Sequence, residues 1–496
     1  MKKSLFNSHL AMLLIIALAG TTSILFAERV TVGKGFGWDG IRYGQIAMDF
    51  YHWFSTDDVS AYSLQRIMPS AIVHYGLRAL AIHPTIESVI TGFAVYNLTL
   101  ILLSCLLWIK IADQLRIGLA GRWLGFAGLF VNFAILKQAF YYAVLTDVSA
   151  FTLGLLMLYL FLTGRVFLLF LATLAGAFTW PVVIYAGLPL MLFRKRPVEA
   201  GGNKGHGPAL ATAALLTALV LWLMVDTYFF TGLRSIHGST PVLGQLVYLS
   251  IAVSCLCFFF ATKTLIGMTG PGDLLLALRS VTAARLILPL LAFIASRAII
   301  GALGGIEGGS DYARNYLQQI ALLSIAKPFV FIVAHAVYFG PAVILMVLLW
   351  DRVSAVVRQQ GAGMVLFFLM SLFLGLNSES RQLIFAYPFF VAFLVKAVEP
   401  IRWGASFYWA FGAVALVMSK FWLRINTGPL EGLSPQEFPL QYYFLNHGPW
   451  MTDSTFLLQA ALVSLITLLF AMSLYSTGSW PYGVANPSLR HNDSYL

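Results

Sequence analysis

The sequence predicts an all-α integral membrane protein, a polytopic bundle of about 12–13 transmembrane helices in a single domain over residues 1–496. Of the 496 residues, 59% are hydrophobic and only 10% are charged, whereas a typical soluble domain is roughly 25% charged. Apolar runs of about 20 residues, the length that crosses a hydrocarbon core of about 30 Å, recur along the whole chain. The net charge of +11 is spread over many loops without forming a basic face, so nucleic acid is not an expected partner.

Twelve of the apolar runs predict full spans. The first, 8–27, ends in a sequence that resembles a signal-peptidase site. Its apolar stretch exceeds the roughly 7–15 residues of a signal-peptide core, which favours a retained anchor over a cleaved peptide. The other predicted spans are 86–109, 123–138, 142–163, 208–230, 242–262, 286–304, 328–350, 362–377, 382–397, 404–424 and 454–474.

Residues 166–193 are predicted to form a re-entrant pair of broken helices. Arg165 precedes this apolar run and Arg194-Lys195-Arg196 follows it, so the positive-inside rule places both ends in the cytoplasm. The run is too long for one span and too short for two, and Pro181 near its centre removes a helical hydrogen bond. The alternative is one long, tilted helix.

Positive charge in the short loops sets the predicted orientation. With the hairpin returning to the side on which it starts, twelve spans leave both termini in the cytoplasm. The same parity places the first loop, 28–85, and a long late loop, 425–453, outside. The loops assigned to the cytoplasm hold Lys2-Lys3, Lys110/Arg116/Arg122, Arg194-Lys195-Arg196, Lys263/Arg279/Arg285 and Arg352/Arg358.

The first external loop carries the most informative pattern in the chain. From Tyr43 onward, apolar residues recur at the three- and four-residue spacing of one helical face, which predicts a helix lying in the membrane interface. This helix would begin directly after Asp39, so Asp39 is either its N-cap or a catalytic carboxylate. Asp57 and Asp58 fit the first turn of a following helix and are secondary candidates for the catalytic acid.

Three arginines are candidates for contact with a phosphate or a lipid headgroup. Arg381 lies directly before a predicted span, where its guanidinium could bind a lipid phosphate through two hydrogen bonds or pair with the nearby Glu379. Arg297 lies inside a predicted span, where an unpaired charge costs about 2.5–3.5 kcal/mol, so it should face a cavity or snorkel to the outer end. Arg66 could snorkel to headgroups. His335, also within a span, is expected to be a hydrogen-bonded packing residue.

Several stretches together resemble the polytopic GT-C glycosyltransferases, which use polyprenyl-phosphate-linked sugars. The likeness covers about residues 8–400 and rests on hydropathy and short motifs. It consists of a short anchor, Gly37-Trp-Asp39-Gly-Ile-Arg42-Tyr43-Gly-Gln-Ile-Ala47, Gln65-Arg66-Ile-Met-Pro69, Thr146-Asp147-Val-Ser-Ala, the broken pair through Ala177-Phe-Thr-Trp-Pro181, and Glu379-Ser-Arg381-Gln-Leu-Ile-Phe-Ala-Tyr387-Pro388.

The resemblance implies a GT-C-like fold with a sugar-transfer site at the outer membrane surface. In that family an acidic residue of the first external loop is the catalytic centre, and it corresponds here to Asp39. Many members carry a second acid beside it; this chain does not, which leaves open which acid acts and whether a divalent metal is needed. The residues assigned to the donor phosphate are Arg381 and Arg297, and those assigned to substrate binding are Tyr43, Arg42, Arg66 and Asp147.

The predicted function is transfer of a sugar from a polyprenyl-phosphate donor to a lipid or glycan acceptor, at the outer face of a bacterial inner membrane and among its lipids. A single carboxylate suffices for an inverting displacement, so Asp39 would act as the general base. No cofactor is implied apart from the open question of a metal. Two alternatives stand beside this prediction: a transporter or flippase for a lipid-linked or polar solute, and a polysaccharide polymerase or ligase.

Overall fold

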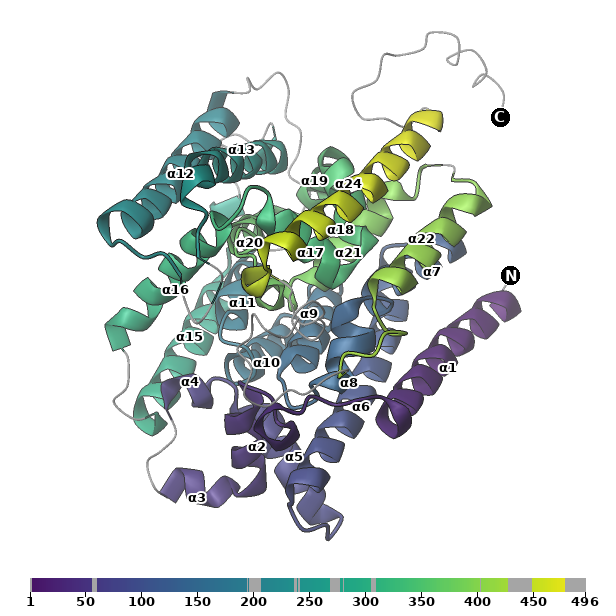
Figure 1. The fold of residues 1–496 in the computed structure, drawn as a ribbon, viewed down its shortest axis with the longest axis vertical. Coiled ribbons are helices and arrows are strands. Elements are labelled where there is room, and N and C mark those ends of the chain that lie inside the picture. The colour runs from purple at the N-terminus through teal and green to yellow at the C-terminus, as the bar shows by residue number, and fades with distance from the viewer. Residues whose placement is uncertain are drawn as a thin grey trace.

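The structure, a computed structural model, is a bundle of α-helices (Figure 1). It describes residues 2–55, 60–193, 195, 207–235, 239, 241–267, 277–279, 281–304, 309–401, 403–426 and 448–477. Within these ranges the chain forms helices and connecting turns and no β-strand. The predicted all-α class is therefore confirmed.

Six helices in the described ranges are long and apolar enough to cross a membrane. Their most apolar windows are only 22–44% buried, so most of their side chains face outward. Apolar side chains exposed along a whole helix fit a lipid surround, and the protein is a multi-pass membrane protein. The six are α1 (Lys2–Phe26), α6 (Ile86–Gln114), α12 (Gly207–Val225) with its π-helical end η3 (Asp226–Phe230), α13 (Val247–Ile266) preceded by η4 (Gly244–Leu246), α15 (Ala283–Leu303) and α24 (Asp453–Ser476).

Shorter helices fill the middle of the bundle. Nearly every residue of α21 (Tyr387–Val398) is buried, and this helix packs against α7 (Leu119–Phe130), α9 (Asp147–Leu162) and α19 (Trp350–Gln359). A helix that is apolar on all sides is expected in such a position. The remaining short helices outside the first loop are η2 (Phe133–Gln138), α8 (Ala139–Tyr141), α10 (Val166–Ala177), α11 (Val183–Leu192), α16 (Gly309–Ser324), α17 (Val330–Phe339), α18 (Pro341–Leu348), α20 (Ala362–Leu374), η5 (Ser380–Leu383), α22 (Ala405–Met418) and η7 (Gly448–Trp450).

The structure has fewer full-length spans than the predicted 12–13. Beside the six long helices of the described ranges, one pair, Leu119–Phe130 with Phe133–Tyr141, is bent by 55° and can count as a seventh span. Four other predicted spans, 142–163, 362–377, 382–397 and 404–424, each correspond to one apolar helix of 10–17 residues. Gly340, with a φ of +80°, and Pro341 divide the predicted span 328–350 into α17 and α18. Hydropathy cannot detect such a break, and irregular backbone is tolerated in a membrane protein where other protein surrounds it.

The predicted break at Trp180-Pro181 is present. Helix α10 ends at Ala177 and α11 begins at Val183. The two helices pack antiparallel, because Gly176 lies against Val183 and Gly187 lies against Thr173. Helix α15 packs along both of them. The chain therefore folds back on itself at this point, and a single continuous helix through Pro181 is excluded.

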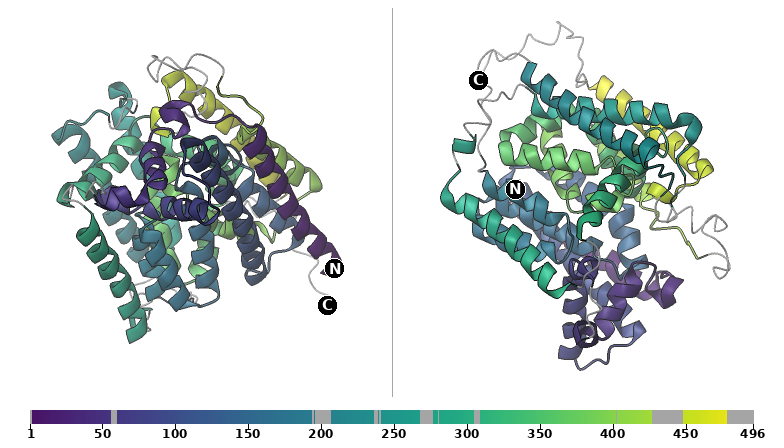
Figure 2. Two further views of the ribbon diagram at one scale, coloured as in Figure 1. Left: turned by 90° about the horizontal axis from the view of Figure 1, so that it is seen from below. Right: turned by 90° about the vertical axis from the view of Figure 1, so that its left-hand side faces the viewer.

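The first predicted external loop forms short helices gathered at one end of the bundle (Figures 1 and 2). The single helix predicted after Asp39 is divided at Asp49, whose carboxylate accepts a hydrogen bond from the backbone N–H of His52 at 3.2 Å and so caps the second piece. Asp57, Asp58 and most of the late loop 425–453 lie outside the described residues. The elements of this end are η1 (Val32–Gly35), α2 (Gly40–Met48), α3 (Phe50–Ser55), α4 (Ala61–Leu64) and α5 (Ile67–Ala79).

Candidate functional site

Arg381 joins two acids from distant parts of the chain. Its Nε donates to Asp147 Oδ1 at 2.9 Å and its Nη2 donates to Asp147 Oδ2 at 3.1 Å. Its Nη1 donates to Asp39 Oδ2 at 3.0 Å. Three residues that the sequence motifs singled out are thus assembled into one group, called here the Arg381 cluster.

Each member of the Arg381 cluster lies at the end of a helix. Asp39 directly precedes α2, Asp147 is the first residue of α9, and Arg381 lies in the short turn η5 between α20 and α21. A carboxylate in the first turn of a helix is stabilised by the helix dipole, which accounts for Asp147 at this position. The helix ends bring their side chains together where the segment 28–85 meets the buried bundle.

Exposure falls steeply across the cluster. The side chain of Asp39 is 44% exposed, that of Arg381 is 11% exposed and that of Asp147 is 5% exposed. Burial alone would lower the pKa of Arg381, but the adjacent carboxylates of Asp147 and Asp39 raise it well above its ordinary value. The cluster therefore keeps a permanent positive charge inside and presents one carboxylate, that of Asp39, to the outside.

The N-cap interpretation of Asp39 is wrong. Helix α2 begins directly after Asp39 as predicted, but no side-chain hydrogen bond from this residue caps it. The Asp39 side chain instead reaches Arg381 through Oδ2. Among the described residues its Oδ1 has no hydrogen-bond partner, so one carboxylate oxygen is left for a ligand.

Glycines on both sides of Asp39 allow the chain to approach the segment before α9. A Cβ atom on Gly37, whose φ is +74°, would lie 2.3 Å from the ring of Tyr142. A Cβ atom on Gly40 would lie 2.7 Å from the carbonyl oxygen of Val144 and 2.9 Å from the same ring. The N–H of Gly40 donates to the Tyr142 hydroxyl at 3.0 Å. The absence of side chains at Gly37 and Gly40 therefore lets the segment that carries Asp39 pack directly against Tyr142.

Glu379 does not pair with Arg381, contrary to the local pairing considered from the sequence. Its Oε2 accepts hydrogen bonds from Gln319 Nε2 at 3.1 Å and Gln382 Nε2 at 3.3 Å. Burial raises the pKa of Glu379, against the lowering effect of the nearby Arg381 charge. Glu379 is therefore a buried carboxyl beside the cluster that is biased towards its protonated form.

His335 fixes the turn that carries Arg381. Its Nδ1 lies 2.9 Å from Ser380 Oγ and its Nε2 lies 2.8 Å from the carbonyl oxygen of Gly375. Both ring nitrogens thus have a hydrogen-bond partner, and the prediction that His335 is a hydrogen-bonded packing residue is confirmed. This role positions η5, and with it Arg381, against α17.

Arg66 lies in an aromatic setting next to the cluster. Its guanidinium carbon is 4.0 Å from the ring centre of Tyr62 and 5.6 Å from that of Trp180. Burial raises the pKa values of both Tyr62 and Tyr43, which share a side-chain hydrogen bond. Tyr62 is also within electrostatic reach of Asp39 and Arg381. The predicted substrate-binding residues Tyr43 and Arg66 therefore adjoin the Arg381 cluster.

The tip of the α10–α11 hairpin supports this aromatic setting. The N–H of Met68 donates to the carbonyl oxygen of Phe178 at 3.0 Å, and the Thr179 hydroxyl lies 3.6 Å from the Met68 sulfur. Trp180 follows directly in the chain and reaches Arg66. The broken hairpin is thereby connected to the segment 28–85.

Two predicted site residues lie apart from the cluster. Arg42 is exposed, with its guanidinium 5.5 Å from the ring centre of Trp53. Arg297 is exposed on α15 and, among the described residues, forms no ion pair with an acid of the cluster. The arrangement thus gives no support to a shared phosphate site of Arg297 and Arg381.

The described residues bring no three His, Cys, Asp or Glu side chains together in a way that could hold a metal ion. Other members of the site were missed from the sequence. Tyr142 and Gln319 lie in stretches without a motif, and their roles come from contacts with segments far along the chain. Trp180 was noted only for its place in the helix break. In the sequence, the adjacent Pro181 was the feature that marked Trp180 as a position of structural interest.

Comparisons with protein families, with curated proteins and with solved structures found no match to this chain. The function is therefore inferred from the residues and their geometry.

Proposed function

We propose that this protein is a membrane glycosyltransferase of the GT-C type, which transfers a sugar from a polyprenyl-phosphate donor to a lipid or glycan acceptor. Its main support is the contact of Arg381 with Asp39 and Asp147, which unites in one cluster the three charged residues of the motifs that resemble this family. The exposed carboxylate and buried guanidinium are the two charges that transfer from a phosphate carrier requires.

Asp39 is the general base in this proposal. Its Oδ1 takes the proton from an acceptor hydroxyl as the acceptor oxygen forms a bond to the anomeric carbon of the sugar. The bond between that carbon and the phosphate oxygen breaks, and the polyprenyl phosphate leaves with the electron pair. One carboxylate suffices for this inverting displacement.

Arg381 holds Asp39 in position and also supplies positive charge to the donor phosphate. A guanidinium carries five N–H groups, and the three hydrogen bonds to Asp147 and Asp39 leave two of them for a phosphate oxygen. Tyr62 lies within reach of both Arg66 and Arg381, so a donor phosphate placed beside Tyr62 would meet positive charge on two sides. When Glu379 is protonated, its carboxyl group adds no negative charge that would repel the donor phosphate.

The same proposal fixes an orientation. The Arg381 cluster faces the outer side of a bacterial inner membrane, both termini are cytoplasmic, and the α10–α11 hairpin enters and leaves from the cytoplasm. The loop charge bias supports this arrangement. A lipid-linked donor in the outer leaflet then meets Asp39 where the first external segment joins the bundle.

One observation favours a transporter as the second candidate. Glu379 is a buried carboxyl with a raised pKa beside a buried arginine and a buried aspartate, and such groups carry protons in membrane transporters. In that function the Arg381 cluster would change its pairing as a solute or proton passes, and no bond to a sugar would break.

The experiment that separates the two uses purified protein in lipid nanodiscs and in liposomes. The nanodiscs receive polyprenyl-phosphate sugars with candidate acceptors, and released polyprenyl phosphate and glycosylated product are measured. Equal release of carrier and product supports the transferase. Movement of an intact lipid-linked or polar solute across the liposome membrane, with no carrier released for any sugar, rejects it in favour of a transporter.

A further inference from the structure

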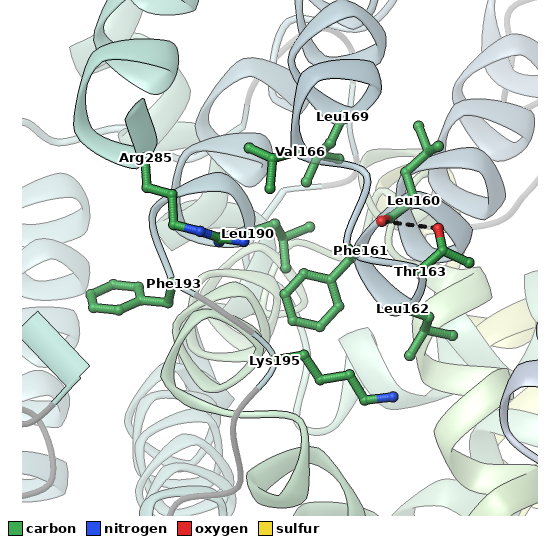
Figure 3. Close-up of a pocket in the computed structure, with 11 residues that line it drawn as sticks. Leu160, Phe161, Leu162, Thr163, Val166, Leu169, Leu190, Phe193, Lys195 and Arg285 are labelled. Carbon is green, nitrogen blue, oxygen red and sulfur yellow. Dashed lines mark hydrogen bonds between the residues drawn. The ribbon is translucent and has the colours of Figure 1, made fainter. Parts of the chain in front are cut away.

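A cavity of about 350 Å³ lies at the far end of α9 from the Arg381 cluster (Figure 3). Asp147 is the first residue of α9, and Leu160, Phe161 and Leu162 in its last turn line the cavity. At 1.5 Å of rise per residue, about 20 Å of helix separates the two sites. The cavity and the Arg381 cluster are therefore separate sites, one at each end of α9.

The walls of this cavity combine apolar and cationic side chains. Phe161 comes from α9, Leu169 from α10 and Leu190 from α11, at the open end of the hairpin. Arg285 reaches in from the start of α15 and Lys195 from the chain that follows α11, as Figure 3 shows. An anion with an apolar neighbour is the ligand that matches such a lining.

Arg285 is held in place by a helix that borders the cavity. Arg285 Nη1 donates to the carbonyl oxygen of Met191 at 3.2 Å, which fixes its side chain against the last turn of α11. Partial burial lowers the pKa of Lys195, so a bound anion would stabilise its charged form.

We infer that this cavity binds the phosphate headgroup of an anionic phospholipid from the leaflet on the Lys195 side. Basic pockets between transmembrane helices bind anionic headgroups, and those on the cytoplasmic side favour them. The outward faces of the bordering helices expose Phe167 and Leu171 on α10 and Leu286 on α15, beside which acyl chains can lie. The lipid would hold the open end of the hairpin against α9 and α15. This inference does not depend on the proposed function.

Native mass spectrometry of the purified protein with phosphatidylglycerol or phosphatidylcholine tests the inference. A basic side chain near an anionic lipid contributes about a fivefold gain in affinity, so the double variant Lys195→Gln/Arg285→Gln should bind phosphatidylglycerol roughly 30-fold more weakly. The charge-conserving variant Lys195→Arg/Arg285→Lys should retain most of the binding. The matched control is Lys110→Gln, an exposed basic residue of α6 outside the cavity, which should change little.

The unaltered protein supplies a second readout that needs no variant. It should retain phosphatidylglycerol more tightly than phosphatidylcholine and be stabilised against heat by the former. Equal retention of the two lipids would overturn the inference, as would an equal loss in the Lys110→Gln control. Inorganic phosphate that stabilises the protein as well as phosphatidylglycerol does would show a site for a free anion and would also overturn it.

Discussion

Both carboxylate oxygens of Asp147 accept hydrogen bonds from Arg381, although 234 positions separate the two residues in the chain. This paired contact is almost wholly buried, whereas the third contact of the guanidinium, to Asp39, lies at the surface. Asp147 therefore sets the position of Arg381, and Arg381 in turn sets the position of Asp39. The exposed acid is held by a chain of contacts that begins inside the bundle.

Replacement of Arg381 by glutamine should strongly destabilise the protein. It leaves the buried carboxylate of Asp147 without its charged partner, and breaking a buried pair in this way costs about 3–5 kcal/mol. The matched variant is Arg297→Gln, because Arg297 is exposed and forms no ion pair among the described residues. Thermal unfolding in detergent measures the stability of both variants. Equal effects of the two substitutions would show that the Arg381 cluster contributes no particular stability.

Replacement of Gly40 by alanine should displace Asp39. The new methyl group would lie 2.7 Å from the Val144 carbonyl oxygen, which is part of the backbone and cannot turn away. Such overpacking costs about 1–3 kcal/mol. Gly76→Ala in α5 is the control, since nothing lies within 4 Å of a Cβ there and alanine favours a helix by up to about 1 kcal/mol. Unfolding temperatures of the two variants should move in opposite directions, and a neutral Gly40→Ala would contradict the close approach to Tyr142.

The sequence predicted the helical class, the break at Pro181 and the three residues of the Arg381 cluster. It could not predict their mutual contacts, because Asp39 and Arg381 are 342 residues apart and no local periodicity reports such a pairing. The predicted number of spans exceeds the number of full-length spans in the described ranges for a related reason. Hydropathy measures apolar content, and that content is the same in an unbroken span and in the divided helices α17 and α18. Of the two roles considered for Asp39, the N-cap is wrong, because the side chain of Asp39 contacts the distant guanidinium of Arg381 instead.

The stability of the protein should depend on pH through Glu379. Its native pKa is raised above the ordinary value of 4.5, so its contribution to stability is full below pH 4.5 and is lost as the pH rises through the native pKa. Glu379→Gln keeps the side-chain oxygen that Gln319 and Gln382 contact and removes the charge. The variant should therefore be more stable than the unaltered protein near pH 7.5, with a difference that shrinks towards about pH 4.5. A constant difference across this range would show that Glu379 does not titrate in this way.

The orientation can be tested at the two ends of α6. His83 lies just before this helix and Lys110 lies near its end, and both are exposed. With Cys105, Cys255 and Cys257 replaced, a cysteine at position 83 should react with a membrane-impermeant thiol reagent in intact cells. A cysteine at position 110 should react only after the membrane is opened. The reverse pattern would invert the orientation and place the Arg381 cluster on the cytoplasmic side.

The central claim is that Asp39 acts as a base in sugar transfer, and Asp39→Asn tests it most directly. Asparagine retains an oxygen for Arg381 but cannot accept the acceptor proton, and a general base contributes about 10²–10⁴-fold to a rate. The matched control is Asp49→Asn in the same segment, 28–85, because asparagine caps a helix as well as aspartate does. We expect single-turnover transfer from a polyprenyl-phosphate sugar to fall at least about 100-fold in Asp39→Asn and to remain unchanged in Asp49→Asn. Full transfer by a folded Asp39→Asn protein would contradict the account.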